Sequence, residues 1–252
     1  MPSAPQFNKF TNMKKLILLA LTVTSIANAQ LKDILNKANE KISTATGVPI
    51  GTTDISAGLK EALNKGVEKQ VSKLTAMDGF YKNEAVKILM PAELSKVDKT
   101  MRKLGMGKLA DDGIKSLNRA AEDAVKEATP IFVAAIKNMS ITDAKNILMG
   151  NDNAATSYLQ SATTSALYAK FLPIVQQSMG KVGADKIWAS LITKYNGMPM
   201  VSKVNPDIND YVTQKALEGV FKMIAVEELS IRTDISSRTS PLLKKVFAMQ
   251  DK

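Results

Sequence analysis

The sequence contains no cysteine and no histidine. The first absence excludes disulfides, thiolate metal sites, thiol nucleophiles and a lipid anchor on an N-terminal cysteine. The second excludes serine-histidine and cysteine-histidine catalytic groups, imidazole zinc sites and the Glu-x-x-His motifs of di-iron bundles. Any reaction would therefore depend on carboxylates, lysine, tyrosine or hydroxyl groups. We expect neither a metal nor an organic cofactor.

Aromatic residues make up only 5% of the chain, and only four of its 34 basic residues are arginines. Arginine is the residue that binds phosphate in a bidentate manner and reads base edges, so we expect no nucleic-acid partner. The formal charge of +10 is carried almost wholly by lysine. A solvated lysine surface is the simplest explanation, and attraction to anionic lipid or to envelope polymers is the alternative.

A short apolar run lies near the start of the chain. Two lysines, Lys14 and Lys15, precede the apolar residues 16–23, and Ala27-Asn28-Ala29 forms a small-x-small cleavage site. These are the three regions of a secretory signal peptide, and the apolar run is too short to span a bilayer. We therefore expect cleavage between Ala29 and Gln30, a periplasmic or secreted protein, and no transmembrane segment in the mature chain.

Residues 1–12 add no feature that a signal peptide needs, so we predict that translation begins at Met13 and that 1–12 is a spurious upstream extension. Removing residues 1–29 takes away three lysines and no acid, which lowers the formal charge from +10 to +7. We expect residues 30–53 to form an N-terminal helix and a flexible loop that contains Gly47, Pro49 and Gly51. Residues 54–252 then form the main helical domain.

The remaining pattern is helical throughout. Alanine, lysine, leucine and methionine are plentiful, apolar residues recur at helical spacing, and no segment alternates as a strand would. No fixed repeat is present. The sequence therefore predicts an all-α fold, a compact bundle of about nine or ten amphipathic helices and not a repeat solenoid. The expected helices cover 31–42, 54–74, 91–104, 108–129, an element from 130, a short helix that ends at 150, a long helix from 154, 183–195, 210–232 and 241–247.

Several residues indicate where helices begin. Asp54 is a candidate N-cap, and Ser140 with Asp143 resembles a capping box, in which each side chain bonds the other's backbone. We expect residues 151–153, Asn-Asp-Asn, to cap the long helix that follows. Within that helix, Pro173 predicts a kink or a division into two helices.

Two glycines lie inside the expected helix 54–74. Gly58 and Gly66 each weaken a helix by about 1 kcal/mol relative to alanine. We therefore expect both to mark close contacts with neighbouring helices.

Four segments resemble a known family. Residues 117–122 (LNRAAE), 141–148 (ITDAKNIL), 210–221 (DYVTQKALEGVF) and 242–247 (LLKKVF) are similar to the signature blocks of the exported bacterial family known only as domain of unknown function 4197. The resemblance runs from about Ile55 to Phe247. It implies a helical, envelope-located domain and assigns no catalytic residues, because the family has no assigned reaction.

The candidate site is a buried polar patch centred on the most apolar helix, 210–232. Glu227 and Glu228 both project from its apolar side, and Arg232 follows Glu228 by four residues, the favourable order for an ion pair. The pair is either a structural ion pair or part of a pocket in which a carboxylate with a raised pKa binds a ligand or cation. Asn118 and Thr163 flank the apolar faces of their own helices and are expected to complete the patch.

Other motif matches are incomplete. Ser178 and Lys181 have the Ser-x-x-Lys spacing of penicillin-recognising enzymes, but the companion motifs are absent. Arg119 falls with Lys115, Glu122 and Lys126 on the polar face of its helix, where solvent or a pair three residues apart is expected.

The function stays open at this stage. We favour a non-enzymatic periplasmic helical binding or interaction module, with an apolar ligand or a partner helix as its occupant. One alternative is a carboxylate-based enzyme that uses Glu227 and Glu228. The other is a lysine-rich envelope component that binds anionic lipid or polymer.

Overall fold

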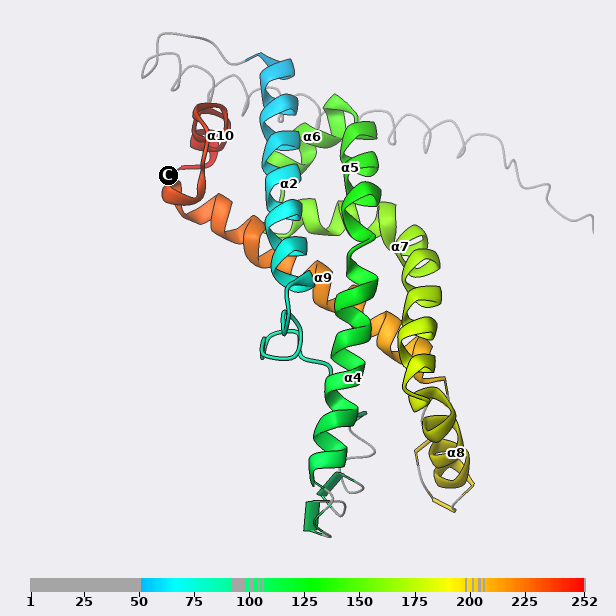
Figure 1. Cartoon of the computed structure of the whole chain (residues 1–252). Coiled ribbons are helices and arrows are strands. Elements are labelled where there is room, and N and C mark those ends of the chain that lie inside the picture. The colour runs from blue at the N-terminus through cyan, green and yellow to red at the C-terminus, as the bar shows by residue number, and fades with distance from the viewer. Residues whose placement is uncertain are drawn as a thin grey trace, which may run out of the picture. The chain divides into compact units, whose positions relative to one another are not determined.

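The computed structural model describes residues 51–91, 98–99, 102–103, 105, 107–197, 199–200, 202–203, 205 and 207–251, without the side chains of Ile187, Leu191 and Lys194. These residues form eight α-helices, two short 3-10 helices and no strand, which confirms the all-α prediction. The α-helices are α2 (Thr52–Thr75), α4 (Gly107–Val125), α5 (Ala128–Asn138), α6 (Ile141–Leu148), α7 (Ala154–Lys181), α8 (Ala184–Asn196), α9 (Ile208–Thr233) and α10 (Pro241–Phe247), and the 3-10 helices are η2 (Ile235–Ser237) and η3 (Ala248–Gln250) (Figure 1).

Two of the expected helices do not belong to this set. The helix predicted at 31–42, the signal peptide and the proposed extension 1–12 all lie outside the described residues. The helix predicted at 91–104 lies outside them except for Pro91 and two pairs of helical residues, 98–99 and 102–103. The eight described α-helices all belong to one unit, Thr52–Gln250.

The expected helix 108–129 is shorter than predicted. Helix α4 ends at Val125, and Ala128 already belongs to α5. The reason is Pro130, which has no N–H to donate to the carbonyl of Lys126, so the hydrogen-bond ladder of α4 cannot continue. Pro130 is tolerated as the third residue of α5, since the first N–H groups of a helix have no partner within the helix.

Other boundaries differ by small steps. Helix α2 begins at Thr52, so Asp54 lies in its first turn instead of at the N-cap, where its charge still complements the helix dipole. The capping box of Ser140 and Asp143 is confirmed. Helix α7 continues through Pro173 as one helix, so of the two predicted outcomes, a kink or a division, the division is wrong.

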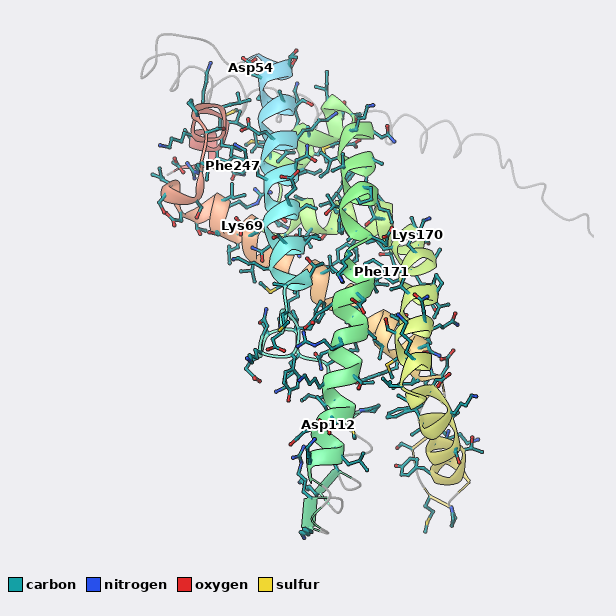
Figure 2. The ribbon with its side chains drawn as sticks, viewed as in Figure 1. Asp54, Lys69, Asp112, Lys170, Phe171 and Phe247 are labelled. Carbon is teal, nitrogen blue, oxygen red and sulfur yellow. The ribbon has the colours of Figure 1, made fainter. Side chains whose placement is uncertain are left out.

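Helix α9 occupies the centre of the packing. It contacts α2, α4, α7 and α8, and Figure 1 shows it passing behind α2 and α4. Its Phe221 ring meets the ring of Phe132 on α5 edge to face, with centroids 5.8 Å apart. Apolar side chains such as Phe171 and Phe247 are buried in this core, whereas Lys170 is exposed (Figure 2). None of the helices in the described part of the chain has the length and apolarity of a membrane span.

Glycine allows the closest helix approaches. A Cβ atom on Gly58 of α2 would lie 2.5 Å from Val246 Cγ2 on α10, and one on Gly66 would lie 3.3 Å from Glu227 Cγ on α9. The prediction that both glycines mark close contacts is therefore confirmed. Gly219 of α9, for which no prediction was made, also packs closely: a Cβ atom there would lie 2.7 Å from the ring of Phe80 in the turn after α2.

Candidate functional site

Glu228 binds the N-terminal end of α7. Its Oε1 accepts a hydrogen bond from the backbone N–H of Ala155 (2.9 Å), and its Oε2 accepts from the N–H (2.8 Å) and the hydroxyl (2.7 Å) of Thr156. Asn153, which stands at the N-cap, makes no side-chain capping bond. The predicted cap of α7 is thus replaced by a carboxylate from another helix, and its negative charge complements the positive end of the α7 dipole.

Arg232 binds the C-terminal end of α6. Its guanidinium donates to the carbonyl oxygens of Leu148 (Nη1, 3.1 Å) and Ile147 (Nη2, 2.8 Å), and its Nη2 lies 2.9 Å from Glu228 Oε1. Both side chains of the ion pair are buried. The pair therefore joins two helix ends of opposite dipole sign, since a cation favours the C-terminus of α6 and an anion the N-terminus of α7.

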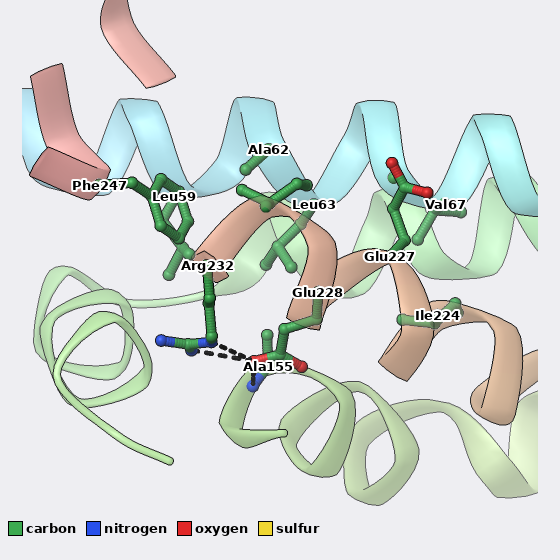
Figure 3. Close-up of a pocket in the computed structure, with 12 residues that line it drawn as sticks. Leu59, Ala62, Leu63, Val67, Ala155, Ile224, Glu227, Glu228, Arg232 and Phe247 are labelled. Atoms are coloured by element: carbon green, nitrogen blue, oxygen red, sulfur yellow. Dashed lines mark hydrogen bonds and ion pairs between the residues drawn. The ribbon is translucent and has the colours of Figure 1, made fainter. Parts of the chain in front are cut away.

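Glu227 binds α2, unlike Glu228, which binds α7. Its Oε1 accepts from Lys69 Nζ (2.6 Å) and its Oε2 from Gln70 Nε2 (2.5 Å), both on α2. Figure 3 shows the carboxylate of Glu227 directed toward α2, while that of Glu228 is directed toward Ala155. The carboxylates of the two acids are therefore bound to different helices, whereas an enzyme that uses both would need them directed at one substrate.

A small cavity of about 20 Å³ lies beside these residues. Glu227, Glu228 and Arg232 form part of its lining, and apolar residues of α2 and α9, with Ala155 and Phe247, form the rest. Such a space accommodates about one water molecule. It is too small for an apolar ligand.

The other two predicted patch residues lie elsewhere. Asn118, which is 0% exposed, binds the backbone of Ile88: its Oδ1 accepts from the N–H and its Nδ2 donates to the C=O, both at 2.8 Å. Thr163 donates to the carbonyl of Leu159 in its own helix (2.6 Å). The structure thus brings together Glu228 and Arg232, binds the neighbouring Glu227 to α2, and does not join Asn118 or Thr163 to them.

A third buried acid was missed by the sequence pattern. Glu122, expected on the polar face of α4, is buried, and its Oε1 accepts from the N–H groups of Phe80 (3.1 Å) and Tyr81 (3.4 Å). Arg119 binds its other oxygen at 2.5 Å and also pairs with Asp78, so the expected pair three residues apart is present. The available signal was the spacing of four residues from Asn118, which puts both polar side chains on one stripe of the helix.

No part of the described chain gathers three or more acidic side chains in a group able to hold a metal ion. In the comparison with protein families, the model described as "Protein of unknown function (DUF4197)" matches residues 49–248. The chain belongs to the DUF4197 family. This confirms the resemblance found from the four sequence segments. No curated protein and no solved structure shows significant similarity to the chain.

The polar positions described above lie within the part of the chain that the DUF4197 model covers. The ion pair and the Asn118 contact both satisfy backbone groups of neighbouring segments. Their geometry is that of residues that hold the fold together.

Proposed function

We propose that this protein is a non-enzymatic interaction module of the bacterial envelope, which binds an amphipathic helix of a partner protein on the exposed face of α9. The envelope location rests on the sequence features of the leader, residues 13–29. The interaction rests on the surface of α9.

The supporting observation is a change of character along the exposed face of α9. Its first half carries Lys215, Glu218 and Lys222, whereas its second half exposes Val226 (51%) and Leu229 (45%), followed by Ile235 (59%) in η2. We call Val226, Leu229 and Ile235 the α9 apolar patch. Contiguous exposed apolar side chains on a folded domain are typical of interaction surfaces.

An open depression of about 560 Å³ adjoins this patch. It is lined by Ala225 and Leu229 on the apolar side and by residues 151–153, Asn-Asp-Asn, on the polar side. An amphipathic helix matches such a surface, because its apolar stripe covers the aliphatic side chains while its polar flank meets the asparagines.

The contacts of Glu227 and Glu228 favour this surface proposal over an enzyme that uses the two acids and over an apolar ligand in the core. Glu228 accepts three hydrogen bonds from α7, and Glu227 accepts two from α2. The oxygens of both acids are therefore engaged in holding helices, and the adjoining cavity of about 20 Å³ has no room for a substrate or an apolar ligand.

A photo-crosslinking residue at Leu229 tests the helix proposal in the envelope of expressing cells. We expect an adduct with an amphipathic helix of another protein, and we expect Val226→Glu to abolish it. Leu109 is the matched control, because it is an equally apolar side chain of α4 that is 61% exposed. The proposal fails if position 229 gives no adduct, gives the same adducts as position 109, or crosslinks only to a second copy of the chain.

The location has its own test. Protein recovered from the periplasm should begin at Gln30, and a precursor blocked in cleavage should begin at Met13. A cytoplasmic protein that retains its leader would contradict the envelope location, and a precursor peptide covering Met1 to Asn12 would contradict the start at Met13.

A second candidate is the lysine-rich surface. Lys115 and Lys181 line an open groove of about 380 Å³ between α4 and α7, and neither forms an ion pair with a described residue. This supports binding of anionic lipid or polymer. Binding to phosphatidylglycerol vesicles should then fall steeply as salt increases and should be lost in the Lys115→Gln/Lys181→Gln variant. Binding that does not depend on salt would remove this candidate.

A further inference from the structure

The depression beside the α9 apolar patch carries a negative charge. Asp152, in the turn between α6 and α7, lines the same open space of about 560 Å³ as Leu229 of the patch. Its side chain is exposed and forms no hydrogen bond or ion pair with any described residue. The side chains of Asn151 and Asn153, on either side of it, likewise have no partner among the described residues. Three adjacent polar side chains are therefore available to a molecule that occupies the depression.

The start of α7, which adjoins this depression, has no free N–H group for an anion. The first four N–H groups of a helix lack partners within the helix and commonly bind anions. Here those of residues 154 and 157 donate to backbone carbonyls of the turn before, at 3.0 and 2.9 Å. Those of residues 155 and 156 donate to Glu228. An anionic partner would therefore meet the charges of Asp152 and Glu228 without gaining a backbone hydrogen bond.

The other exposed charge next to the patch is also negative. The patch belongs to or adjoins three segments, 149–153, 223–233 and 234–240, whose exposed charged residues are Asp152 and Asp234. The remaining charged residues of these segments are buried, namely Glu227, Glu228, Arg232 and Arg238. The formal charge of the whole chain is +10, so the surroundings of the patch have the opposite sign to the chain as a whole.

Asp234 is held in its charged form. It immediately precedes Ile235 of the patch, and its carboxylate accepts hydrogen bonds from the hydroxyl (2.7 Å) and the N–H (2.8 Å) of Ser236. These bonds lower the pKa of Asp234, so the side chain is ionised at neutral pH. It forms no ion pair with a described residue. Both acids beside the patch can therefore attract a cation.

A cationic side chain of a partner helix suits these two acids. A helix that lays its apolar stripe on Val226 and Leu229 brings the residues that flank the stripe to the edge of the contact, where Asp152 lies. A lysine or arginine there gains an ion pair, whereas a glutamate meets a like charge, which is costly across an interface. The lysine-rich remainder of the chain repels a basic helix, so the two acids also restrict where such a helix binds.

We propose that the helix bound on the α9 apolar patch is basic, with lysine or arginine residues that flank its apolar stripe and pair with Asp152 and Asp234. This inference rests on the proposed docking of a helix on α9 and adds the chemistry of the partner. The docking itself would remain valid for a helix with neutral flanks, so the two proposals can fail separately.

Three synthetic peptides test the charge of the partner against the purified chain. Each is an amphipathic helix of about 18 residues with the same leucine stripe, and the flanks of the stripe carry lysine, glutamine or glutamate. We expect the lysine peptide to bind about ten-fold more tightly than the glutamine peptide, and the glutamate peptide to bind most weakly. The advantage of lysine should largely disappear at about 1 M salt, where charges are screened within about 3 Å. A photo-crosslinking residue at Leu229 reports whether each peptide occupies the patch.

Two variants locate the charge effect. Asp152→Asn keeps the shape of the side chain and should weaken binding of the lysine peptide about three-fold, with no change for the glutamine peptide. Glu127→Gln is the matched control, because Glu127 is an exposed acid at the N-cap of α5 that does not line the depression. It should leave the affinity for both peptides unchanged.

The outcomes separate this inference from the docking on which it rests. Equal affinities of the lysine and glutamine peptides, with crosslinks at position 229, would overturn the basic partner and leave the docking intact. Tighter binding of the glutamate peptide would do the same. Absence of a crosslink with all three peptides would remove both proposals. In expressing cells, the segment crosslinked to position 229 should carry lysine or arginine beside its apolar stripe, and an acidic or uncharged helix there would overturn the inference.

Discussion

The buried ion pair on α9 and the buried Asn118 and Glu122 on α4 both bring polar groups into an apolar core, but they satisfy different kinds of backbone. Glu228 and Arg232 bind the ends of two regular helices, α7 and α6. Asn118 and Glu122 bind the non-helical segment 79–88, through Ile88 and Phe80. The first cluster therefore positions helices that have their own hydrogen-bond ladders, whereas the second specifies the shape of a segment that has none.

The two clusters also differ in how their charges are compensated. We call Glu228 with Arg232 the α9 cluster, and Asn118 with Glu122 the α4 cluster. In the α9 cluster each charge faces the opposite partial charge of a helix end and the opposite charge of its partner. In the α4 cluster the deepest contact is a neutral amide, and the charged Glu122 has a partner, Arg119, whose side chain is 33% exposed. Loss of a residue should thus leave an uncompensated buried charge in one region and a locally released segment in the other.

The largest expected effect is that of Glu228→Ala. It leaves Arg232 charged and buried and removes the cap of α7, so we expect a loss of about 3–5 kcal/mol in the free energy of unfolding. Urea denaturation followed by circular dichroism measures this. Glu218→Ala, which removes an exposed pair with Lys215, is the control and should change stability by less than about 0.5 kcal/mol.

The double variant Glu228→Met/Arg232→Leu separates charge from capping. It removes both buried charges but leaves the ends of α6 and α7 without partners. We expect it to remain clearly less stable than wild type, unlike buried ion pairs that can be replaced without loss. Full recovery of stability would show that the helix-end contacts contribute little.

The next effect is that of Asn118→Leu. This change keeps the volume and leaves the N–H and C=O of Ile88 buried without partners, so we expect a loss of about 2–3 kcal/mol. Hydrogen exchange should accelerate in residues 79–88, whereas Glu228→Ala should accelerate it in α6 and the first turn of α7. Asn146→Leu on the exposed side of α6 is the matched control. The comparison between the two regions breaks down if both variants give the same exchange pattern.

A smaller contrast comes from two glycines that pack closely against side chains of other segments, Gly219 and Gly58. Gly219→Ala would push against Phe80, which the Glu122 contact holds, and we expect a loss of about 1–3 kcal/mol. Gly58→Ala would push against Val246 on the short terminal helix α10, which can shift, so its loss should be smaller. Gly113→Ala meets no atom within 4 Å and should stabilise α4 by about 0.5–1 kcal/mol. Thermal unfolding of the three variants gives the order.

The smallest effect is a pH dependence that lies outside both clusters. The Tyr168 hydroxyl donates to Asp210 (2.6 Å), and this hydrogen bond to a carboxylate raises the pKa of Tyr168 to about 12. An unfolded tyrosine titrates near 10, so the contribution is present below about pH 10 and is lost as pH rises to about 12. Tyr168→Phe should be less stable than wild type at pH 8, and the difference should shrink by pH 12. A difference that does not change with pH would contradict the assignment.

The sequence pattern was sufficient for regular elements. Helical spacing identified α2, α6, α8, α9 and α10, and the Ser140–Asp143 capping box depends on residues three apart, so it could be read locally. The order of Glu228 and Arg232 predicted their pairing for the same reason. The N-cap of α7 could not be predicted, because the carboxylate that replaces it comes from a residue more than 70 positions later.

The buried position of Glu122 was missed for a related reason. A glutamate beside Arg119 and Lys126 has the pattern of a solvent-exposed face, and only the return of segment 79–88 to α4 covers it. Likewise, residues 151–153 have the composition of a helix start. Their proximity to Leu229 depends on the packing of α7 on α9, which a single sequence does not reveal.

The contact between Glu228 and the start of α7 also has a kinetic consequence. The C-terminal end of α6 and the N-terminal end of α7 are close in the sequence, and we call them the α6–α7 corner. Their hydrogen-bond partners, Arg232 and Glu228, lie in the last third of α9, 72 to 85 positions away. Contacts of such sequence separation form late, because the intervening chain must first be ordered. The corner therefore acquires its native shape only when α9 packs, and it links the completion of the N-terminal helices to the arrival of the C-terminal ones.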